Sequence, residues 1–282
     1  MTFKRNVIDV RDFGVRVNRE IDNTDALQDA IDSANCPDEG ATFGGVVELP
    51  EGVIYLASMP HMMSRVVLRG QGKRTTMIKA LPGFVGDYLI DLDQGRGLSF
   101  DSRLESLSVN CSGIDGLSGL RATVLQEGCG VASVMVCDYT KYGIHLNGNV
   151  ANASWIDTEI YSSNSGAEIG FYVEEAGGAC NLQRSTVNGG RQKIGMRFGS
   201  GAWDIGAVHL EQCDIGIVTE DQAAGMTSTI NGGNGTQTVI ENNGNWWTFI
   251  NTIRGPAEHT LIDKARGRTL DDTYLHIYTP QQ

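Results

Sequence analysis

Asp157 and Glu159 are acidic residues two positions apart, in a segment whose alternating apolar and polar residues are typical of a β-strand. Alternate residues of a strand point to the same face, about 6.6 Å apart, so both carboxylates would face outward together. Two carboxylates separated by about 6.5–9.5 Å can act as general acid and general base in an inverting glycoside hydrolase. This pair is therefore the first catalytic candidate, and a surface ion pair is the alternative.

Equivalent positions in the segments that follow hold Arg184, His209 and Glu211. If these segments stack as parallel strands about 4.8 Å apart, their side chains extend the same polar patch. Glu211 is then a second partner for an acid–base pair, and His209 is a group that can transfer a proton. Arg184 and Tyr161 are the substrate-binding candidates of this patch.

A second set of polar residues follows short apolar pairs further along each segment. It contains His145, Tyr172 and Arg197, which lie 27 and 25 residues apart. On consecutive strands these residues suit a polysaccharide lyase, in which one group removes the proton beside a uronate carboxylate and a cation stabilises the charge. They could equally bind a neutral sugar or be ordinary exposed strand residues. A register slip of one residue would turn all of them into the core.

These candidates depend on a repeat that runs from Leu104 to about Glu241. Each unit has three key positions, which are mostly apolar. Two residues separate the first from the second, and one residue separates the second from the third. The five examples are Leu104-Leu107-Val109, Val131-Val134-Val136, Trp155-Thr158-Ile160, Leu182-Ser185-Val187 and Ile205-Val208-Leu210. Their first members lie 27, 24, 27 and 23 residues apart. Such a repeat indicates units that bury their apolar faces only by stacking.

The apolar runs of this repeat are short, have period two, and are interrupted by Gly, Asn and Ser. Helical repeats would instead need apolar residues three and four positions apart over several turns. A chain in which each short strand pairs with its counterpart one turn later satisfies both periods. The pattern therefore predicts an all-β fold, a parallel β-helix, in a single domain.

The N-terminal segment departs from the repeat. Residues 7–10 predict a strand, and Leu27, Ala30 and Ile31 fall at helical spacing behind a cap region at Asn23. A short amphipathic helix there would cover the open end of the β-helix. We expect an N-terminal strand and capping helix in residues 1–45, the β-helix in 46–250, and a C-terminal cap or oligomer contact in 251–282.

The net charge of −12 argues against a nucleic-acid or anionic-membrane partner. The six cysteines form no C-x-x-C pair and have no His-x-x-x-His partner, so we expect reduced, mostly buried thiols and no metal or other cofactor. The sequence carries no recognisable secretory signal or transmembrane run. We therefore expect synthesis in the cytoplasm and, in one interpretation, a place in a virion.

Three segments of the first 80 residues resemble a known superfamily. They are Val10-Arg11-Asp12-Phe13-Gly14, the run from Asn23 to Ile31, and the run from Gly44 to Tyr55, continued by Val67-Leu68-Arg69-Gly70-Gln71-Gly72. Together they resemble the opening of the pectate-lyase-like right-handed β-helix superfamily, which includes phage tailspike depolymerases, polysaccharide lyases, glycoside hydrolases and alginate C5-epimerases. The resemblance implies a right-handed β-helix, a polysaccharide partner and, from the tailspike members, a homotrimer.

The catalytic signatures of these subfamilies are mostly missing. The chain has no polygalacturonase-like Asp-Asp or Gly-His-Gly segment, and Tyr142-Gly143-Ile144-His145 is only a weak echo of the epimerase segment. Two functions therefore stay open. The first is a tailspike-like glycoside hydrolase or polysaccharide lyase that binds and cleaves an extended polysaccharide along a lateral groove. The second is a non-catalytic structural or receptor-binding β-helix of a virion or surface assembly.

Overall fold

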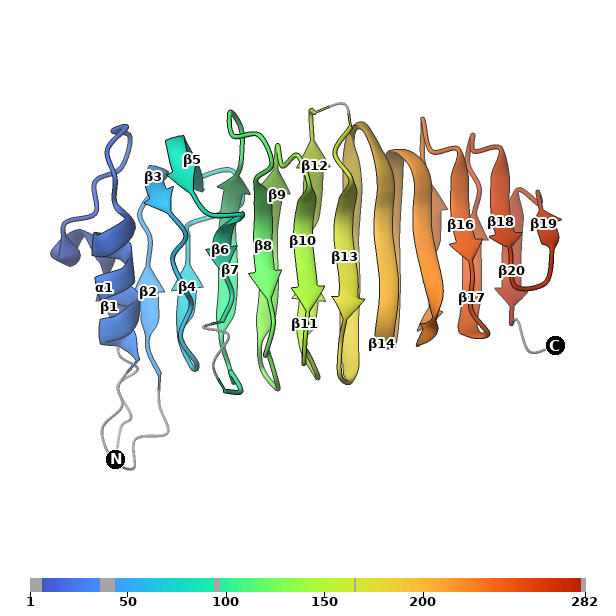
Figure 1. Cartoon of the computed structure of the whole chain (residues 1–282), viewed down its shortest axis with the longest axis horizontal. Helices are drawn as coiled ribbons and strands as arrows, with labels where there is room; N and C mark the ends of the chain where they lie inside the picture. The colour runs from blue at the N-terminus through green and yellow to red at the C-terminus, as the bar shows by residue number, and fades with distance from the viewer. Residues whose placement is uncertain (1–6, 36–43, 94–96, 165, 280–282) are drawn as a thin grey trace.

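The computed structural model describes residues 7–35, 44–93, 97–164 and 166–279. They form one long column of stacked turns, with α1 (Thr24–Ala34) at one end and the C-terminal strands at the other (Figure 1). A short 3-10 helix, η1 (Val10–Phe13), precedes α1.

The strands are, in chain order, β1 (Val7–Asp9), β2 (Val46–Glu48), β3 (Gly52–Ser58), β4 (Val67–Arg69), β5 (Thr76–Val85), β6 (Tyr88–Asp91), β7 (Arg103–Asn110), β8 (Ser118–Ala122), β9 (Gly130–Cys137), β10 (Tyr142–Asn147), β11 (Ser154–Ile156), β12 (Glu159–Ser162), β13 (Ile169–Glu175), β14 (Ala179–Thr227), β15 (Ile230–Gly232), β16 (Thr238–Asn242), β17 (Trp246–Ile253), β18 (His259–Asp263), β19 (Arg268–Leu270) and β20 (Tyr274–Tyr278). β14 is unbroken over two turns, since its first part pairs with β11–β13 and its second with β15–β17.

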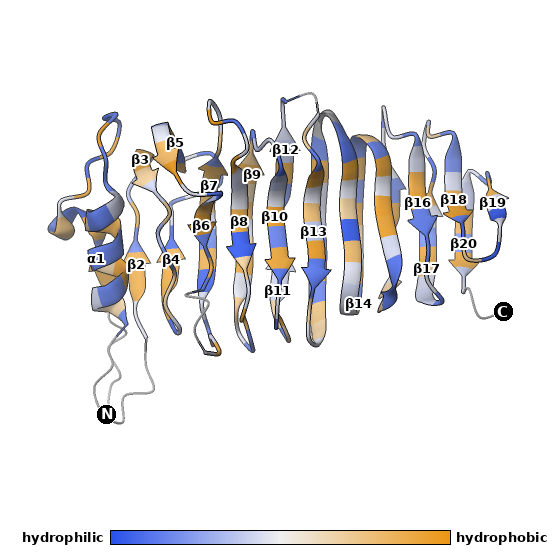
Figure 2. Ribbon diagram, viewed as in Figure 1, coloured by the Kyte–Doolittle hydropathy of each residue, from blue (hydrophilic) through white to orange (hydrophobic). Residues whose placement is uncertain are grey.

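The repeat of the sequence sets the register of the column. Leu104 pairs with Val131, Val131 with Trp155, and Trp155 with Leu182, always between parallel strands. All fifteen residues of the five repeat units are at most 2% exposed, and bands of hydrophobic and hydrophilic residues alternate along the strands (Figure 2). The predicted parallel β-helix with a short N-terminal helix is therefore confirmed.

The two-residue gap inside each repeat unit is a bend. Its second residue has a left-handed backbone in five successive turns, with φ between 47° and 57°. These residues are Ser106, Ser133, Asp157, Arg184 and Ala207. Asp157 accordingly lies between β11 and β12, whereas Glu159 begins β12. The prediction that the two carboxylates lie on one continuous strand was wrong, because the left-handed residue redirects the chain there.

A row of five glycines marks a second fixed point of each turn. A Cβ atom on Gly143 would lie 2.5 Å from the carbonyl oxygen of Gly170, and one on Gly170 would lie 2.6 Å from that of Gly195. Gly119 and Gly216 extend the row in both directions. The backbones of neighbouring turns thus approach closely at this point, and only glycine fits between them.

The helix α1 covers the N-terminal end of the column as expected. Its buried face contains Leu27, Ala30 and Ile31. Asn23 occupies the N-cap position, but its side chain bonds elsewhere, and Asp22 Oδ1 accepts the Thr24 N–H at 2.9 Å instead. The Ala57 N–H of β3 also donates to Asp22 Oδ1 and to Thr24 Oγ1, both at 3.0 Å, which ties the start of α1 to the first turns. The helix thus shields strand edges that would otherwise be open.

Parallel pairing continues through β18, beyond residue 250. The last two strands are antiparallel, β19 to β18 and β20 to β17, and close the C-terminal end. Inside this half, aromatic rings pack against one another, as in Phe198 and Trp247, whose centroids are 5.3 Å apart. The five cysteines of the described residues are unpaired and buried, and Cys36 lies outside the described residues. No helix of the described ranges is long and apolar enough to cross a membrane.

Candidate functional site

The loop between β4 and β5 holds the first candidate pair in ion pairs. Lys73 Nζ lies 2.8 Å from Asp157 Oδ1, and Arg74 binds both carboxylate oxygens of Glu159 at 2.9 and 3.1 Å. Ser133 Oγ donates a further hydrogen bond to Asp157 Oδ2 at 2.6 Å. Each carboxylate therefore already has a basic partner that stabilises its charged form, which disfavours a general acid at this place.

The pKa of Asp157 reflects these contacts. Partial burial raises the pKa of its carboxyl group, but the hydrogen bonds from Lys73 and Ser133 outweigh burial and bring the pKa below its ordinary value. A lowered pKa in the folded state stabilises the fold above the pKa of the unfolded chain, and this stabilisation is lost as the pH falls through the folded-state pKa.

Replacing Asp157 with Asn should therefore destabilise the protein at pH 7 and have little effect in strong acid. Asn tolerates the left-handed backbone as well as Asp does, so the change removes mainly the charge. The Asp157 side chain is 41% exposed, and we expect a loss of only about 0.5–1 kcal/mol. Urea unfolding at pH 7 and at about pH 2 measures it. An equal loss at both pH values would contradict the assignment.

The remaining residues of the first patch lie on β12 and β14. His209 Nε2 is 2.9 Å from Glu211 Oε1, and Asn188 donates to Glu211 Oε2 at 2.8 Å. Tyr161 is 39% exposed and pairs in register with Asn188. Arg184 occupies the left-handed bend position and is exposed. The patch is continuous across three turns, but its acids are bound to neighbouring side chains.

A second line of polar residues runs along β6, β8, β10, β13 and β14. His61, Asp91, Arg121, His145, Tyr172 and Arg197 lie in register on consecutive turns, and we call this line the polar track. His145, Tyr172 and Arg197 have the register that the sequence predicts. The track begins three turns earlier than those residues, at His61.

His145 is the most enclosed residue of the polar track. Its ring stacks on that of Tyr172, with centroids 4.9 Å apart and planes 2° apart, and Tyr142 lies at 4.7 Å. Tyr88 also stacks on it, at 5.9 Å. These rings leave the His145 side chain only 5% exposed. The expectation of an exposed strand residue was wrong at His145, because tyrosines from three turns cover it.

Both nitrogens of His145 have partners. Nε2 lies 3.0 Å from Glu174 Oε2, and Nδ1 lies 2.6 Å from the Tyr88 hydroxyl. An ionised carboxylate can only accept, so Nε2 carries the proton and Nδ1 accepts from Tyr88. Burial lowers the pKa of His145, although the hydrogen bond that His145 donates to Glu174 opposes this. Burial raises the pKa of Tyr88 to about 12, so its hydroxyl stays protonated at neutral pH.

Glu174 reaches His145 through an irregularity of the sheet. Leu146 pairs with Val173, but Asn147 pairs with Glu175, so Glu174 is an extra residue on β13. Such a bulge redirects side chains and is frequent beside active sites. Here it places the Glu174 carboxylate against the ring nitrogen of a residue on the preceding turn.

Each of the three tyrosines has a basic side chain over its ring. Arg121 lies 5.6 Å from the centroid of Tyr88, Lys141 lies 5.1 Å from that of Tyr142, and Arg197 lies 5.8 Å from that of Tyr172. Arg197 also binds Glu220 at 2.8 Å. Burial raises the pKa of Tyr142 and of Tyr172, which keeps both phenols protonated. The track thus combines aromatic rings, phenol donors and cations on one face.

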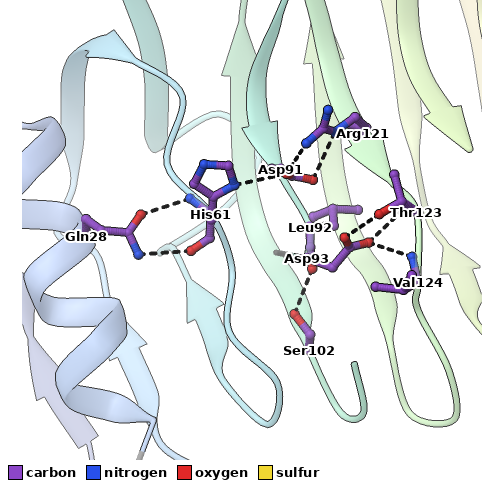
Figure 3. A network of polar contacts seen from close by, with 9 residues as sticks. All are labelled: Gln28, His61, Asp91, Leu92, Asp93, Ser102, Arg121, Thr123 and Val124. Carbon is purple, nitrogen blue, oxygen red and sulfur yellow. Dashed lines mark hydrogen bonds and ion pairs between the residues drawn. The ribbon is translucent and has the colours of Figure 1, made fainter. Parts of the chain in front are cut away.

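The N-terminal part of the polar track surrounds a buried carboxylate. Asp91 lies between His61 and Arg121, which bind it at 2.9 and 2.5 Å (Figure 3). On the same turn, Asp93 accepts hydrogen bonds from the backbone and hydroxyl of Thr123. Within the described ranges, no group of three His, Cys, Asp or Glu side chains is arranged to hold a metal ion.

Several of these residues were missed in the sequence. Asp91 and Arg121 follow Ile90 and Leu120, as His145 follows Ile144, so the second repeat pattern already contained a signal for them. Tyr88 and Glu174 carried no such signal, because their contacts depend on a side chain that crosses turns and on a bulge.

A family model described as "Rhamnogalacturonase A/epimerase, pectate lyase-like" matches residues 7–251. No curated protein matches the sequence. The fold is similar to that of the N-terminal fragment of bacteriophage Phi29 gene product 12, with 16% identity and a TM-score of 0.64 over 84% of this chain and 43% of that chain.

Two other solved structures share the fold. An iota-carrageenase complexed to iota-carrageenan fragments has 13% identity and a TM-score of 0.58 over 86% of this chain and 57% of that chain. The enzymatically active domain of bacteriophage CBA120 tailspike protein 2 has 14% identity and a TM-score of 0.54 over 92% of this chain and 43% of that chain. The chain thus spans less than two thirds of each of these three structures.

Proposed function

The chain belongs to the rhamnogalacturonase A/epimerase, pectate lyase-like family of carbohydrate-active β-helix proteins, and on this premise we propose that it binds an extended polysaccharide along the polar track and cleaves it. The main support is the cluster of Tyr88, Tyr142 and Tyr172 around His145. The centroids of their rings lie 4.7–5.9 Å from that of the histidine ring.

This cluster supports glycan binding in two ways. The edges of the tyrosine rings offer apolar contact to the C–H groups of a sugar, and the hydroxyl groups of Tyr142 and Tyr172 can donate hydrogen bonds to its oxygens, while that of Tyr88 is bonded to His145. The six residues of the track also follow the column axis at about 4.8 Å per turn, so they span about 24 Å. A track of this length suits a chain of several sugars better than a single one.

The basic side chains over the tyrosines favour an acidic polysaccharide. Lys141 contacts the Tyr142 ring and forms no ion pair with any described residue, so its charge is free for a substrate carboxylate. The iota-carrageenase in the comparison has the same fold and holds carrageenan fragments. That structure is a precedent for polysaccharide binding on this fold.

Replacing Tyr172 with Ala should weaken binding of a matching oligosaccharide at least about tenfold, since a central aromatic contact contributes about 1.4 kcal/mol or more. Calorimetry against a panel of acidic and neutral polysaccharides measures the affinity. Tyr274→Ala is the matched control, because Tyr274 is 51% exposed at the C-terminal end, outside the track. Equal binding by both variants, or no binding by the native protein, would contradict the proposal.

A non-catalytic receptor-binding role is the second candidate. One observation favours it: Asp157 and Glu159, which resemble an acid–base pair, are held by Lys73 and Arg74. This candidate predicts that the protein binds a glycan on the track but releases no reducing ends. A homotrimer, as expected from the tailspike resemblance, is the associated proposal, and sedimentation equilibrium measures it.

A further inference from the structure

The side chains around Asp91 form an acid–base arrangement at the N-terminal end of the polar track. The Asp91 side chain is completely buried. Its Oδ2 lies 2.9 Å from His61 Nδ1 and 2.5 Å from Arg121 Nη2, and its Oδ1 lies 3.3 Å from Arg121 Nε. One carboxylate therefore sets the position of both a histidine and an arginine.

The backbone of His61 is fixed independently. Gln28 of α1 accepts the His61 N–H at 2.9 Å and donates to the His61 carbonyl oxygen at 3.1 Å, as Figure 3 shows. His61 also pairs with Asp91 as a parallel bridge. The imidazole thus has little freedom, although its side chain is 42% exposed.

Two polar atoms of this arrangement are unused. Since the Asp91 carboxylate only accepts, the neutral His61 ring carries its proton on Nδ1 and keeps the Nε2 lone pair. Neither His61 Nε2 nor Arg121 Nη1 has a hydrogen-bond partner among the described residues. The exposed edge therefore offers a proton acceptor beside a guanidinium donor.

We propose that His61 is the general base, and Arg121 the carboxylate-binding residue, of a β-elimination on a uronate-containing polysaccharide. This inference rests on the proposed function and gives it a reaction and a substrate class. Arg121 Nη1 binds the uronate carboxylate, which draws charge from the carbon that loses the proton. Asp91 acts as a positioning residue for both groups.

His61 Nε2 takes the proton from C5 of the uronate, and the C5–H electron pair forms a double bond to C4. The bond from C4 to the glycosidic oxygen breaks, and that oxygen takes a proton from water. The imidazolium returns its proton to the hydroxide left behind. One chain becomes two, with an unsaturated uronate at one new end.

The cation and the tyrosines lie in line along the track. The Arg121 guanidinium lies over the Tyr88 ring, and the Tyr88 hydroxyl donates to His145 Nδ1. A uronate held at Arg121 would place the next sugars over the tyrosine cluster. His145, which is enclosed and has both nitrogens engaged, then supports the rings and does not meet the substrate.

Replacing His61 with Gln tests the proposal. Loss of a general base should lower kcat about 10²–10⁴-fold, whereas calorimetric binding of the same polysaccharide should change less than about twofold. The assay follows the ultraviolet absorbance of the unsaturated product. His259→Gln is the matched control, because His259 also bonds an aspartate, Asp271, at 2.8 Å, but at the C-terminal end of the column. It should cleave at the native rate.

A second readout does not depend on turnover. Nitrogen NMR of the imidazole should find the neutral His61 ring protonated at Nδ1, and Asp91→Asn should lose this preference. Four results would each overturn the inference and leave glycan binding intact. They are cleavage at the native rate by His61→Gln, new reducing ends without ultraviolet absorbance, glycan binding by the native protein without cleavage, and a neutral His61 ring with its proton on Nε2. Absence of glycan binding would instead overturn the proposed function itself.

Discussion

Replacing Gly170 with Ala should lower the free energy of unfolding by about 3 kcal/mol, the upper end of the usual cost of forcing extra atoms into a packed interior. The added Cβ would lie 2.6 Å from the carbonyl oxygen of Gly195 and 2.8 Å from Val187 Cγ1. Neither of these two atoms can move away easily, because the first belongs to the backbone and the second to a buried, branched side chain. The neighbouring turns would have to separate to accept it.

Separation at one turn is costly because the glycines form a row. Gly143 and Gly195 have the same relation to the turns that follow them, with distances of 2.5 and 2.6 Å. A local shift at Gly170 therefore changes the spacing of the parallel hydrogen bonds on both sides, and a solenoid transmits it only to its neighbours. We expect the same order of loss at either of the other two positions.

Gly113→Ala is the control for this prediction. Gly113 has φ of +88°, with no atom within 4 Å of an added Cβ, so only backbone strain of about 1 kcal/mol is expected. Urea unfolding followed by circular dichroism measures both variants. An equal loss for the two would show that close approach of the turns does not govern Gly170.

The architecture of the column was readable from the sequence because its core repeats. Leu104, Val131 and Trp155 stack in the order that their spacing implies, and the same register aligns His145 with Tyr172. The bend could not be seen: a polar residue such as Asp157 in a strand-like segment looks the same whether its backbone is extended or left-handed.

The candidate site was readable only in part, because contacts between turns involve residues outside the repeat. Lys73 reaches Asp157 across 84 positions of sequence from a loop with no periodic pattern. Glu174 meets His145 because of a bulge, which shifts one residue against the partner strand. Periodicity therefore predicts which backbones are neighbours, and the direction of long side chains decides which groups react together.

Replacing Asp91 with Ala should cost about 3 kcal/mol of stability, because it leaves the guanidinium of Arg121 without its partner beside a buried cavity. The Arg121 side chain is 31% exposed, which places the expected loss at the lower end for broken buried ion pairs. Asp271→Ala is the matched control: Asp271 also binds a histidine, but its side chain is 56% exposed, and its loss should cost less than about 1 kcal/mol.

The double variant Asp91→Leu with Arg121→Met distinguishes the effect of the two charges from the effect of filling the space that their side chains occupy. Two apolar side chains of similar volume remove both charges, and such replacements are often neutral or stabilising. We therefore expect the double variant to regain most of the stability that Asp91→Ala loses, in the same urea assay. It should still fail to cleave, because His61 has lost the carboxylate that orients it and the substrate has lost the guanidinium of Arg121. A double variant as unstable as Asp91→Ala would mean that the ion pair is needed for folding, and a stable, inactive one that the pair is retained for the chemistry of the track.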